Sequence, residues 1–312
     1  MKKIYLLKIL LSILLSFIIL LSLFNYFNLV KVCDVCVDIY KRPSKNNLNF
    51  KNNFEVLKTF IKLFLIDKTN FIHKEKDSAF FEINNFLGFD KLYYDKIIPI
   101  RCLYREIFID SIYYFVTDKN NPFIIDCGSN RGMSILFFKK IYPNARIVAF
   151  EPYDKAFEIL YKNVVSNNFK DIILINKAVS NKVGKIKFYI SDETIDESFN
   201  FEKDRNNYSE YLVSTTLLSN YINEEVDLLK LDIEASELSV IEDLEQNKKL
   251  RFVKEIIMEY HHTPNLKNNK LSTLMKILEK NNFGYQIGHG LIDPFDKQFP
   301  KCFCILHAYR MN

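Results

Sequence analysis

The sequence has few glycines, few cysteines and little net charge for its length. Only 7 of its 312 residues are glycine and 6 are cysteine. These counts exclude a collagen-like fibre and a small scaffold held by disulfides. Hydrophobic residues make up 48% of the chain and charged residues 26%, which excludes a wholly disordered chain. The length suits one large domain or two modest ones.

The formal net charge of +5 comes from the N-terminal end of the chain. Residues 1–45 hold seven basic and two acidic side chains, whereas residues 46–312 hold 36 of each sign. A domain that binds nucleic acid usually carries a basic excess on its folded part. We therefore expect no nucleic-acid partner.

An uncharged apolar run extends from Ile9 to Val30, with lysines on both sides. As a helix it would span about 33 Å, close to the hydrocarbon thickness of a bilayer. It is longer than the apolar region of a typical signal peptide, and no small-residue cleavage site follows it. We predict a single-pass membrane anchor within residues 1–30, with a cleaved signal peptide as the alternative. Its orientation stays open because positive charge flanks both ends.

Two further segments precede the main body of the chain. Residues 31–53 are predicted to be a linker, because their second half is polar and rich in Asn. Cys33 and Cys36 lie in it, without a second pair at the spacing of a zinc site. Apolar residues recur at three- and four-residue steps in residues 54–119, which predicts a helical extension of two or three amphipathic helices.

Short apolar runs alternate with helical patterns through residues 120–312. The predicted strands are 123–127, 146–150, 172–179, 226–232, 253–260 and 302–309, and the predicted helices are 133–142, 155–166, 236–245 and 271–281. This alternation is typical of an α/β fold with a doubly wound, mostly parallel sheet, as in Rossmann-like proteins. We expect the last strand at an edge, residues 191–211 as a polar surface loop, and ligands at the carboxyl ends of the strands.

Two of the seven glycines, Gly128 and Gly132, lie between the first strand and the first helix of this pattern. Glycine lets the backbone turn tightly there, and the helix N-terminus presents N–H groups to a carboxylate-bearing ligand. Glu151 ends the next strand, where a carboxylate can accept hydrogen bonds from both ribose hydroxyls. Asp126 stands where a dinucleotide site has its first glycine. It would attract the ammonium of an amino acid and repel a pyrophosphate, which favours S-adenosylmethionine as the ligand.

Lys230, Asp232 and Glu234 alternate along the predicted fourth strand, so we expect them on one face. Three charges on a buried strand are costly unless they are paired or functional. They could activate or position an acceptor hydroxyl. Glu259 and His261 end the next strand and could approach Asp232. A metal ion held by Asp232, Glu259 and His261 is an alternative, but the favoured interpretation contains no metal.

Together these motifs resemble the FkbM-type family of class I S-adenosylmethionine-dependent methyltransferases. The matching segments are FIIDCGSNRG (123–132), IVAFEP (147–152), NVVSNN (163–168), INKAVS (175–180), DLLKLDIEASE (227–237) and IIMEYHH (256–262). The resemblance covers about residues 120–310. It implies a Rossmann-like methyltransferase domain over residues 120–312.

The resemblance also implies a role for each matched residue. The cofactor-binding set would be Asp126, Gly128 and Gly132 around the methionine portion with support from Asn130, Glu151 at the ribose, and Asn176 and Ala178 beside the adenine. Asp232 would face the methyl donor or the acceptor hydroxyl, with Lys230, Glu234, Glu259 and His261 as further catalytic candidates. The implied reaction is methylation of an oxygen on a sugar, a glycan or another small hydroxylated acceptor.

One departure from the family leaves other functions open. The family generally has glycine where this chain has Ala235, and an alanine there is strained if the position needs a positive φ. A methyltransferase-fold binding module without turnover is therefore the alternative. A nicotinamide-dependent oxidoreductase is a weaker one, because Asp126 argues against it.

Overall fold

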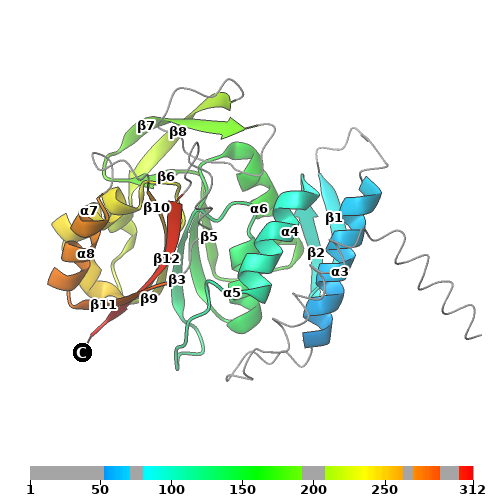
Figure 1. Cartoon of the computed structure of the whole chain (residues 1–312), viewed down its shortest axis with the longest axis horizontal. Coiled ribbons are helices and arrows are strands. Elements are labelled where there is room, and N and C mark those ends of the chain that lie inside the picture. The colour runs from blue at the N-terminus through cyan, green and yellow to red at the C-terminus, as the bar shows by residue number, and fades with distance from the viewer. Residues whose placement is uncertain (1–52, 71–79, 192–207, 263–269, 289–301, 312) are drawn as a thin grey trace, which may run out of the picture. The chain divides into compact units, whose positions relative to one another are not determined.

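The computed structural model describes residues 53–70, 80–191, 208–262, 270–288 and 302–311 (Figure 1). The chain divides into two compact units, residues 1–72 and 73–312. In the first unit the described part is helix α3 (Asn53–Asn70). The predicted anchor lies outside the described residues, and so does the linker up to residue 52. Of the helices that the structure describes, none is both long enough and apolar enough to cross a membrane.

A seven-stranded sheet forms the centre of the second unit, with strand order β11-β12-β10-β9-β3-β4-β5. The strands are β3 (Phe123–Cys127), β4 (Arg146–Phe150), β5 (Ile172–Ile175), β9 (Val226–Leu231), β10 (Val253–His262), β11 (Phe283–Ile287) and β12 (Cys302–Arg310). The five strands from β10 to β5 are parallel, and β12 runs antiparallel to both of its neighbours. The mostly parallel α/β sheet predicted from the sequence is thus present.

Helices cover both faces of this sheet (Figure 1). They are α5 (Met133–Ile141), α6 (Asp154–Ser166), α7 (Glu237–Gln246) and α8 (Leu271–Lys280), with short 3₁₀ turns η2 (Leu218–Tyr221) and η3 (Leu250–Phe252). Apolar side chains of α7 and α8 pack on the sheet as one core, for example Val240 and Leu274. On the other side, Phe137 of α5 and Leu160 of α6 are fully buried. The bounds of all four helices lie within two residues of the predicted ones.

The helices predicted in residues 54–119 are confirmed in part, by α3 and by helical residues 97–109, but a hairpin lies between them in the chain. Residues 81–94 form a β-hairpin of β1 (Phe81–Phe86) and β2 (Phe89–Tyr94), which precedes α4 (Ile97–Tyr104) and a π-helix η1 (Arg105–Ile109). The helical prediction was wrong in the hairpin because Asn85 has a φ of +54° and interrupts the strand alternation. Ile83 and Phe86 are therefore both buried although they are three residues apart, a spacing that imitates a helix.

Two further predictions need correction. The run 172–179 is split, because β6 (Ala178–Ser180) leaves the main sheet and joins a three-stranded sheet with β8 (Tyr208–Leu217) and β7 (Gly184–Ser191). The predicted loop 191–211 thus includes the start of β8, and residues 192–207 lie outside the described part. The last strand, β12, is antiparallel but lies inside the sheet between β10 and β11.

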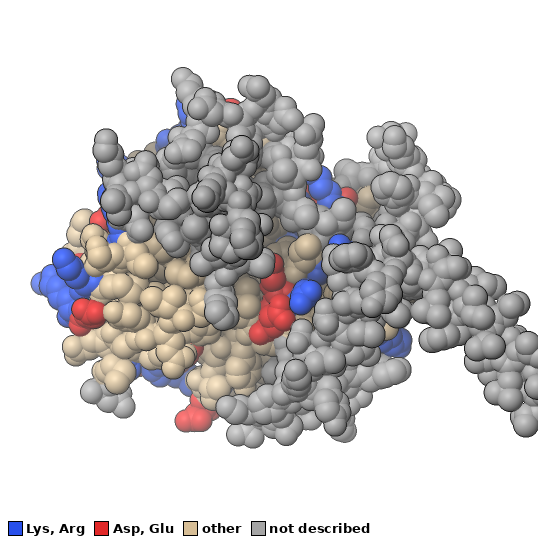
Figure 2. Space-filling view, in the orientation of Figure 1, with Lys and Arg blue, Asp and Glu red and all other residues tan. Residues whose placement is uncertain are grey.

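Figure 2 shows one face of the molecule by charge. On the described surface of this face, basic and acidic side chains lie in small groups of both signs, with uncharged surface between them. The mixture of signs agrees with the equal numbers of acidic and basic residues beyond residue 45.

Candidate functional site

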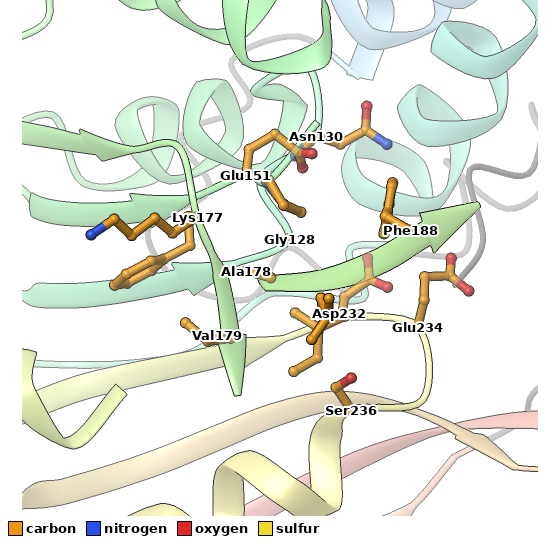
Figure 3. Close-up of a pocket in the computed structure, with 14 residues that line it drawn as sticks. Gly128, Asn130, Glu151, Lys177, Ala178, Val179, Phe188, Asp232, Glu234 and Ser236 are labelled. Carbon is orange, nitrogen blue, oxygen red and sulfur yellow. The ribbon is translucent and has the colours of Figure 1, made fainter. Parts of the chain in front are cut away.

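A cleft lies at the carboxyl ends of β3, β4 and β9, and β7 closes one side of it (Figure 3). Its free space, including the open side, is about 670 Å³. It is lined by Gly128, Asn130, Phe150, Glu151, Pro152, Lys177, Ala178, Val179, Ile186, Phe188, Asp232, Ile233, Glu234 and Ser236. Ligands of open α/β sheets bind at this edge, because the loops that leave the strands meet there.

The turn after β3 needs glycine for a steric reason. Gly128 has a φ of +82°, and a Cβ at this position would lie 1.8 Å from the carbonyl oxygen of Asp232. Gly132, with a φ of +86°, begins helix α5 and leaves room for Leu160. The turn therefore fits tightly between the end of β9 and helix α6.

The backbone N–H groups of residues 128–132 are all used inside the protein. Those of Gly128 and Ser129 donate to the carbonyl of Phe150, and that of Gly132 donates to the carbonyl of Ser129. The N–H of Asn130 donates to Glu151, and the N–H of Arg131 to the side chain of Asn130. The predicted contact of a ligand with the N–H groups at the N-terminus of the following helix α5 (Met133–Ile141) stays a prediction, because these bonds concern the turn alone. The turn is held in shape before any ligand binds.

Glu151 follows β4 directly and lines the cleft although only 6% of its surface is exposed. Its Oε2 accepts the N–H of Asn130 at 2.9 Å, and its Oε1 accepts the N–H of Tyr153 at 2.8 Å. These two bonds fix the orientation of the carboxylate at the wall of the cleft. Asn176 donates to the carbonyl of Glu151 from behind, which makes it a positioning residue rather than part of the cleft wall.

Asp126 and Lys230 form a buried ion pair under the turn. Their side chains are 0% and 2% exposed, and Asp126 Oδ1 lies 3.1 Å from Lys230 Nζ. Asp126 Oδ2 accepts the hydroxyl of Ser134, and Lys230 Nζ donates to the carbonyl of Gly128 at 2.6 Å. Burial alone would lower the pKa of Lys230, but the carboxylates of Asp126 and Asp232 raise it.

This arrangement corrects two predicted roles. Asp126 does not line the cleft, so its predicted direct contact with the ammonium of a ligand is absent from this conformation. Lys230 is likewise enclosed and does not reach an acceptor. Together they neutralise each other inside the fold, and through Lys230 they hold the turn in place.

Asp232 follows the last residue of β9, and its side chain is 23% exposed at the cleft. Its Oδ2 accepts the hydroxyl of Tyr113 at 2.9 Å and lies 3.6 Å from Lys230 Nζ. Burial raises the pKa of Tyr113 well above its usual value, and the charge of Asp232 adds to this effect, so Tyr113 stays a donor. The sequence pattern gave Tyr113 no role, because it lies in an aromatic stretch that is typical of a core.

Glu234 and Ala235 lie beyond β9 in a loop, with positive φ values of +54° and +78°. The predicted strand alternation therefore ends at Lys230, although Glu234 still faces the cleft. Burial, followed by the charges of nearby carboxylates, raises the pKa of Glu234 to about 8.

His261 on β10 lies among three carboxylates. Its Nε2 is 3.5 Å from Glu234 and 3.3 Å from Glu259, and its Nδ1 is 3.2 Å from Glu237. Burial would lower the pKa of His261, but these carboxylates raise it well above its usual value. The predicted approach to Asp232 is present for His261, since one ligand atom of each lies within 4.8 Å of the other, and Glu259 lies beside His261.

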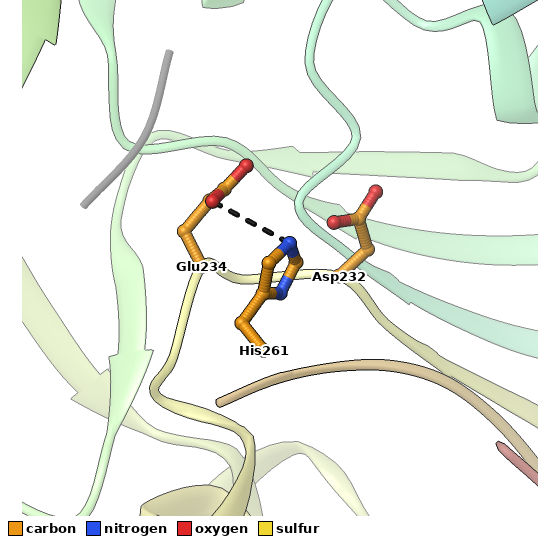
Figure 4. A group of neighbouring side chains, drawn as sticks. All are labelled: Asp232, Glu234 and His261. Carbon is orange, nitrogen blue, oxygen red and sulfur yellow. Dashed lines mark ion pairs between the residues drawn. The ribbon is translucent and has the colours of Figure 1, made fainter. Parts of the chain in front are cut away.

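Asp232, Glu234 and His261 could hold a metal ion, because one ligand atom of each lies within 4.8 Å of the others (Figure 4). This set has Glu234 in place of the Glu259 considered from the sequence. Neither Glu259 nor His261 lines the cleft itself.

Glu106 extends the acidic group from the π-helix η1. Burial and the charges of Glu259 and Asp232 raise its pKa to about 7. Single turns of π-helix are frequent at functional sites. The sequence offered no signal for this element, since its hydrogen-bond pattern cannot be read from apolar spacing.

Apolar side chains make up much of the remaining cleft wall. The apolar residues of the wall include Ala178 and Val179, and Ile186 and Phe188 of β7; Figure 3 shows Phe188 on the side of Asp232 and Glu234. Sequence reasoning missed Ile186 and Phe188 because it gave the small sheet no part in the site. The predicted Ala178 is in the wall.

The turn is also anchored to the hairpin and to helix α6. Arg131 is 2% exposed, and its Nη2 donates to Asp95 Oδ2 at 2.7 Å. The amide of Asn163 on α6 bonds both the carbonyl of Arg131 and the backbone of Tyr93 on β2. The hairpin therefore supports the turn from outside the sheet.

These features together fit S-adenosylmethionine. The apolar side chains of the wall suit the adenine, and the Glu151 carboxylate suits the ribose hydroxyls. The Gly128 turn lies directly against the backbone of Asp232 at the acidic end of the cleft. The acidic side chains at that end suit a ligand with positively charged groups.

Comparison with known proteins agrees with this geometry. The family described as "Methyltransferase FkbM domain" matches residues 126–287, which is more than half of the chain. The chain is 28% identical over 170 residues to Methyltransferase 1 of Beauveria bassiana, covering 47% of this chain and 68% of that protein. It is 26% identical over 205 residues to Methyltransferase sdnD of Sordaria araneosa, covering 54% of this chain and 79% of that protein.

Among solved structures, Methyltransferase FkbM from Methylobacillus flagellatus is similar over 82% of this chain and 60% of its own, with 13% identity and a TM-score of 0.42. The methyl donor of the family is S-adenosylmethionine. The extent of the family match shows that this chain belongs to the FkbM methyltransferases.

Proposed function

We propose that this chain transfers a methyl group from S-adenosylmethionine to an oxygen of a sugar or another small hydroxylated acceptor. The observation that carries this proposal is the meeting of the Gly128 turn, the Glu151 carboxylate and Asp232 in one cleft. The first two would hold the donor, and the third lies where an acceptor would approach. The preference for oxygen comes from the family resemblance.

Glu151 would receive the two ribose hydroxyls while its bonds to Asn130 and Tyr153 keep it in place. Ala178 and Phe188 would lie against the adenine. The bound cofactor supplies a methyl group on a positively charged sulfur. Asp126 and Lys230 act through the shape of the turn, because both are enclosed.

Asp232 is the group we assign to the acceptor. Tyr113 donates to its Oδ2, so Oδ1 can accept a hydrogen bond from the acceptor hydroxyl. Asp232 would orient this hydroxyl and take its proton as the oxygen forms its bond to the methyl carbon and the carbon–sulfur bond breaks. Alignment supplies most of the rate in such a displacement, and base assistance adds to it.

The role of Glu151 can be tested by replacing it with Gln. Loss of a charged acceptor of two hydrogen bonds should weaken binding of S-adenosylhomocysteine by about tenfold or more. Isothermal titration calorimetry measures this directly. Glu158→Gln is the matched control. Glu158 also follows β4, on helix α6, but its side chain is 55% exposed. Equal affinities of the Glu151→Gln variant and the unchanged protein would contradict the assignment.

A binding module without turnover is the second candidate, and the positive φ of Ala235 favours it. The two functions differ in one measurement. Incubation with a methyl-labelled donor and fractionated cell extracts should label a hydroxylated acceptor if the chain is an enzyme. Donor binding with no labelled product from any fraction would favour the binding module.

A further inference from the structure

Asp232, Glu234 and His261 converge from two elements at the acidic end of the cleft. Asp232 and Glu234 come from the loop after β9, and His261 comes from β10 (Figure 4). One ligand atom of each lies within 4.8 Å of the others. Ligands on opposite sides of one ion with bonds of about 2.1 Å are about 4.2 Å apart, so small side-chain rotations would bring all three into contact with an ion.

His261 is held in the orientation of a metal ligand by a carboxylate behind it. Glu237 is 0% exposed, and its Oε1 lies 3.2 Å from Nδ1 of His261. The opposite nitrogen, Nε2, faces Glu234. Histidines that bind metals almost always donate their other N–H to such a carboxylate.

Glu237 gives an observation independent of the three ligands. Its Oε1 also accepts the N–H groups of Ile233 and Ala235, so it fixes the strained loop that presents Glu234. Its Oε2 is buried and has no hydrogen-bond donor among the described residues. A fully buried carboxylate is costly to leave in this state unless positive charge lies nearby.

Positive charge is scarce in this group of side chains. Asp232, Glu234, Glu237 and Glu259 are four carboxylates around one imidazole. Lys230 lies nearer to Asp126, at 3.1 Å, than to Asp232, at 3.6 Å. The carboxylates therefore repel one another at these distances.

We propose that Asp232, Glu234 and His261 bind a small divalent cation of the Mg²⁺ and Mn²⁺ class. Two carboxylates and one imidazole suit such ions, and three protein ligands leave coordination positions for water or an acceptor oxygen. Glu237 is a positioning residue for His261. That the ion would touch the methyl acceptor rests on the proposed function, whereas binding of the ion does not.

The test uses the purified full chain, freed of metal with a chelator and titrated with Mn²⁺. Binding is followed by the electron paramagnetic resonance signal of free Mn²⁺ and by calorimetry, so that no activity is needed. We expect one site, and we expect its affinity to fall about tenfold or more in Glu234→Gln and in His261→Gln. Glu237→Gln should weaken binding by about 10- to 100-fold through the orientation of His261.

Glu255→Gln is the matched control, because Glu255 is a half-buried carboxylate on the same strand outside this group. The affinity of the Glu255→Gln variant for Mn²⁺ should equal that of the unchanged protein. Melting curves recorded in the presence of chelator show whether each variant folds. Because Glu234→Gln, His261→Gln and Glu237→Gln are tested separately, the result stays decisive if one of them does not fold.

Two results would overturn the proposal. One is the absence of Mn²⁺ binding up to millimolar concentration in a protein that still binds S-adenosylhomocysteine, which would leave the proposed methyl transfer standing. The other is unchanged Mn²⁺ affinity in both ligand variants. Conversely, Mn²⁺ binding that depends on Glu234 and His261 in a protein without affinity for S-adenosylhomocysteine would support the cation site and contradict the proposed function.

Discussion

Single backbone conformations decide much of the site. Gly128 is the strictest case, since its φ of +82° and the 1.8 Å approach of the Asp232 carbonyl leave no space for a side chain. At Gly132 the obstacle is the end of the Leu160 side chain, at 2.9 Å, which can move. At Gly288 the nearest atom is 3.6 Å away.

We expect alanine to be tolerated best at Gly288, less well at Gly132 and worst at Gly128. Gly128→Ala should cost about 3 kcal/mol or more, because both backbone strain and a backbone clash oppose it. Gly132→Ala should cost less, and Gly288→Ala should be close to neutral. Thermal and denaturant unfolding of the three variants measures the order. A Gly128→Ala variant as stable as Gly288→Ala would contradict the tight approach at the cleft.

Ala235 is strained by its φ of +78°. Ala235→Gly should raise the free energy of unfolding by about 0.5–1 kcal/mol, because glycine adopts this conformation without a Cβ penalty but loses more chain entropy on folding. Ala235→Val, with a branched side chain at the same φ, should lower it. Unfolding in urea measures the change in the free energy of unfolding for both variants. A loss of stability in Ala235→Gly would show that contacts of the Ala235 methyl group outweigh the backbone strain.

At the scale of elements, β10 carries a carboxylate whose ionisation opposes folding. Burial raises the pKa of Glu255 to about 7, from 4.5. Between these values the folded state holds the proton and the unfolded state has released it, so stability falls as the pH rises through this window.

Glu255→Gln should therefore stabilise the protein more at about pH 8 than at about pH 5, because Gln does not ionise. Melting temperatures of the variant and the unchanged protein at both pH values test this. Glu158→Gln, at an exposed position on α6, should show no such difference. A gain that is the same at both pH values would contradict the buried ionisation.

The hairpin and the small sheet are elements that could not be predicted from the sequence. The helices on the main sheet and strands β3, β4, β9, β10 and β12 follow clear apolar patterns, so their bounds could be predicted closely, whereas β11 was missed. The hairpin could not be predicted, because Asn85 breaks its alternation. Nor could the placing of Ile186 and Phe188 in the cleft wall, since it brings β7 beside Gly128 and Asp232, which are far from it in the sequence.

At the scale of the whole molecule, the apolar run 9–30 predicts attachment to a membrane. The full chain should sediment with membranes and resist an alkaline carbonate wash. Replacing Leu15 and Ile19 by Asp should release it, because each acidic residue at the centre of a spanning helix costs about 2.5–3.5 kcal/mol. The same positions changed to Ala are the control. A full chain found in the soluble fraction would show that the run is not an anchor.

The sequence by itself determined most strands and the covering helices of the main sheet, the position of the turn around Gly128, and the carboxylate at Glu151. It did so because apolar periodicity and glycine conformations are local properties of the chain. Only the tertiary structure decided that Asp126 and Lys230 are enclosed as an ion pair, and that Tyr113, Glu106 and Glu237 join the acidic site. Burial and charge pairing depend on which distant residues become neighbours, and that is settled only when the sheet and its helices pack together.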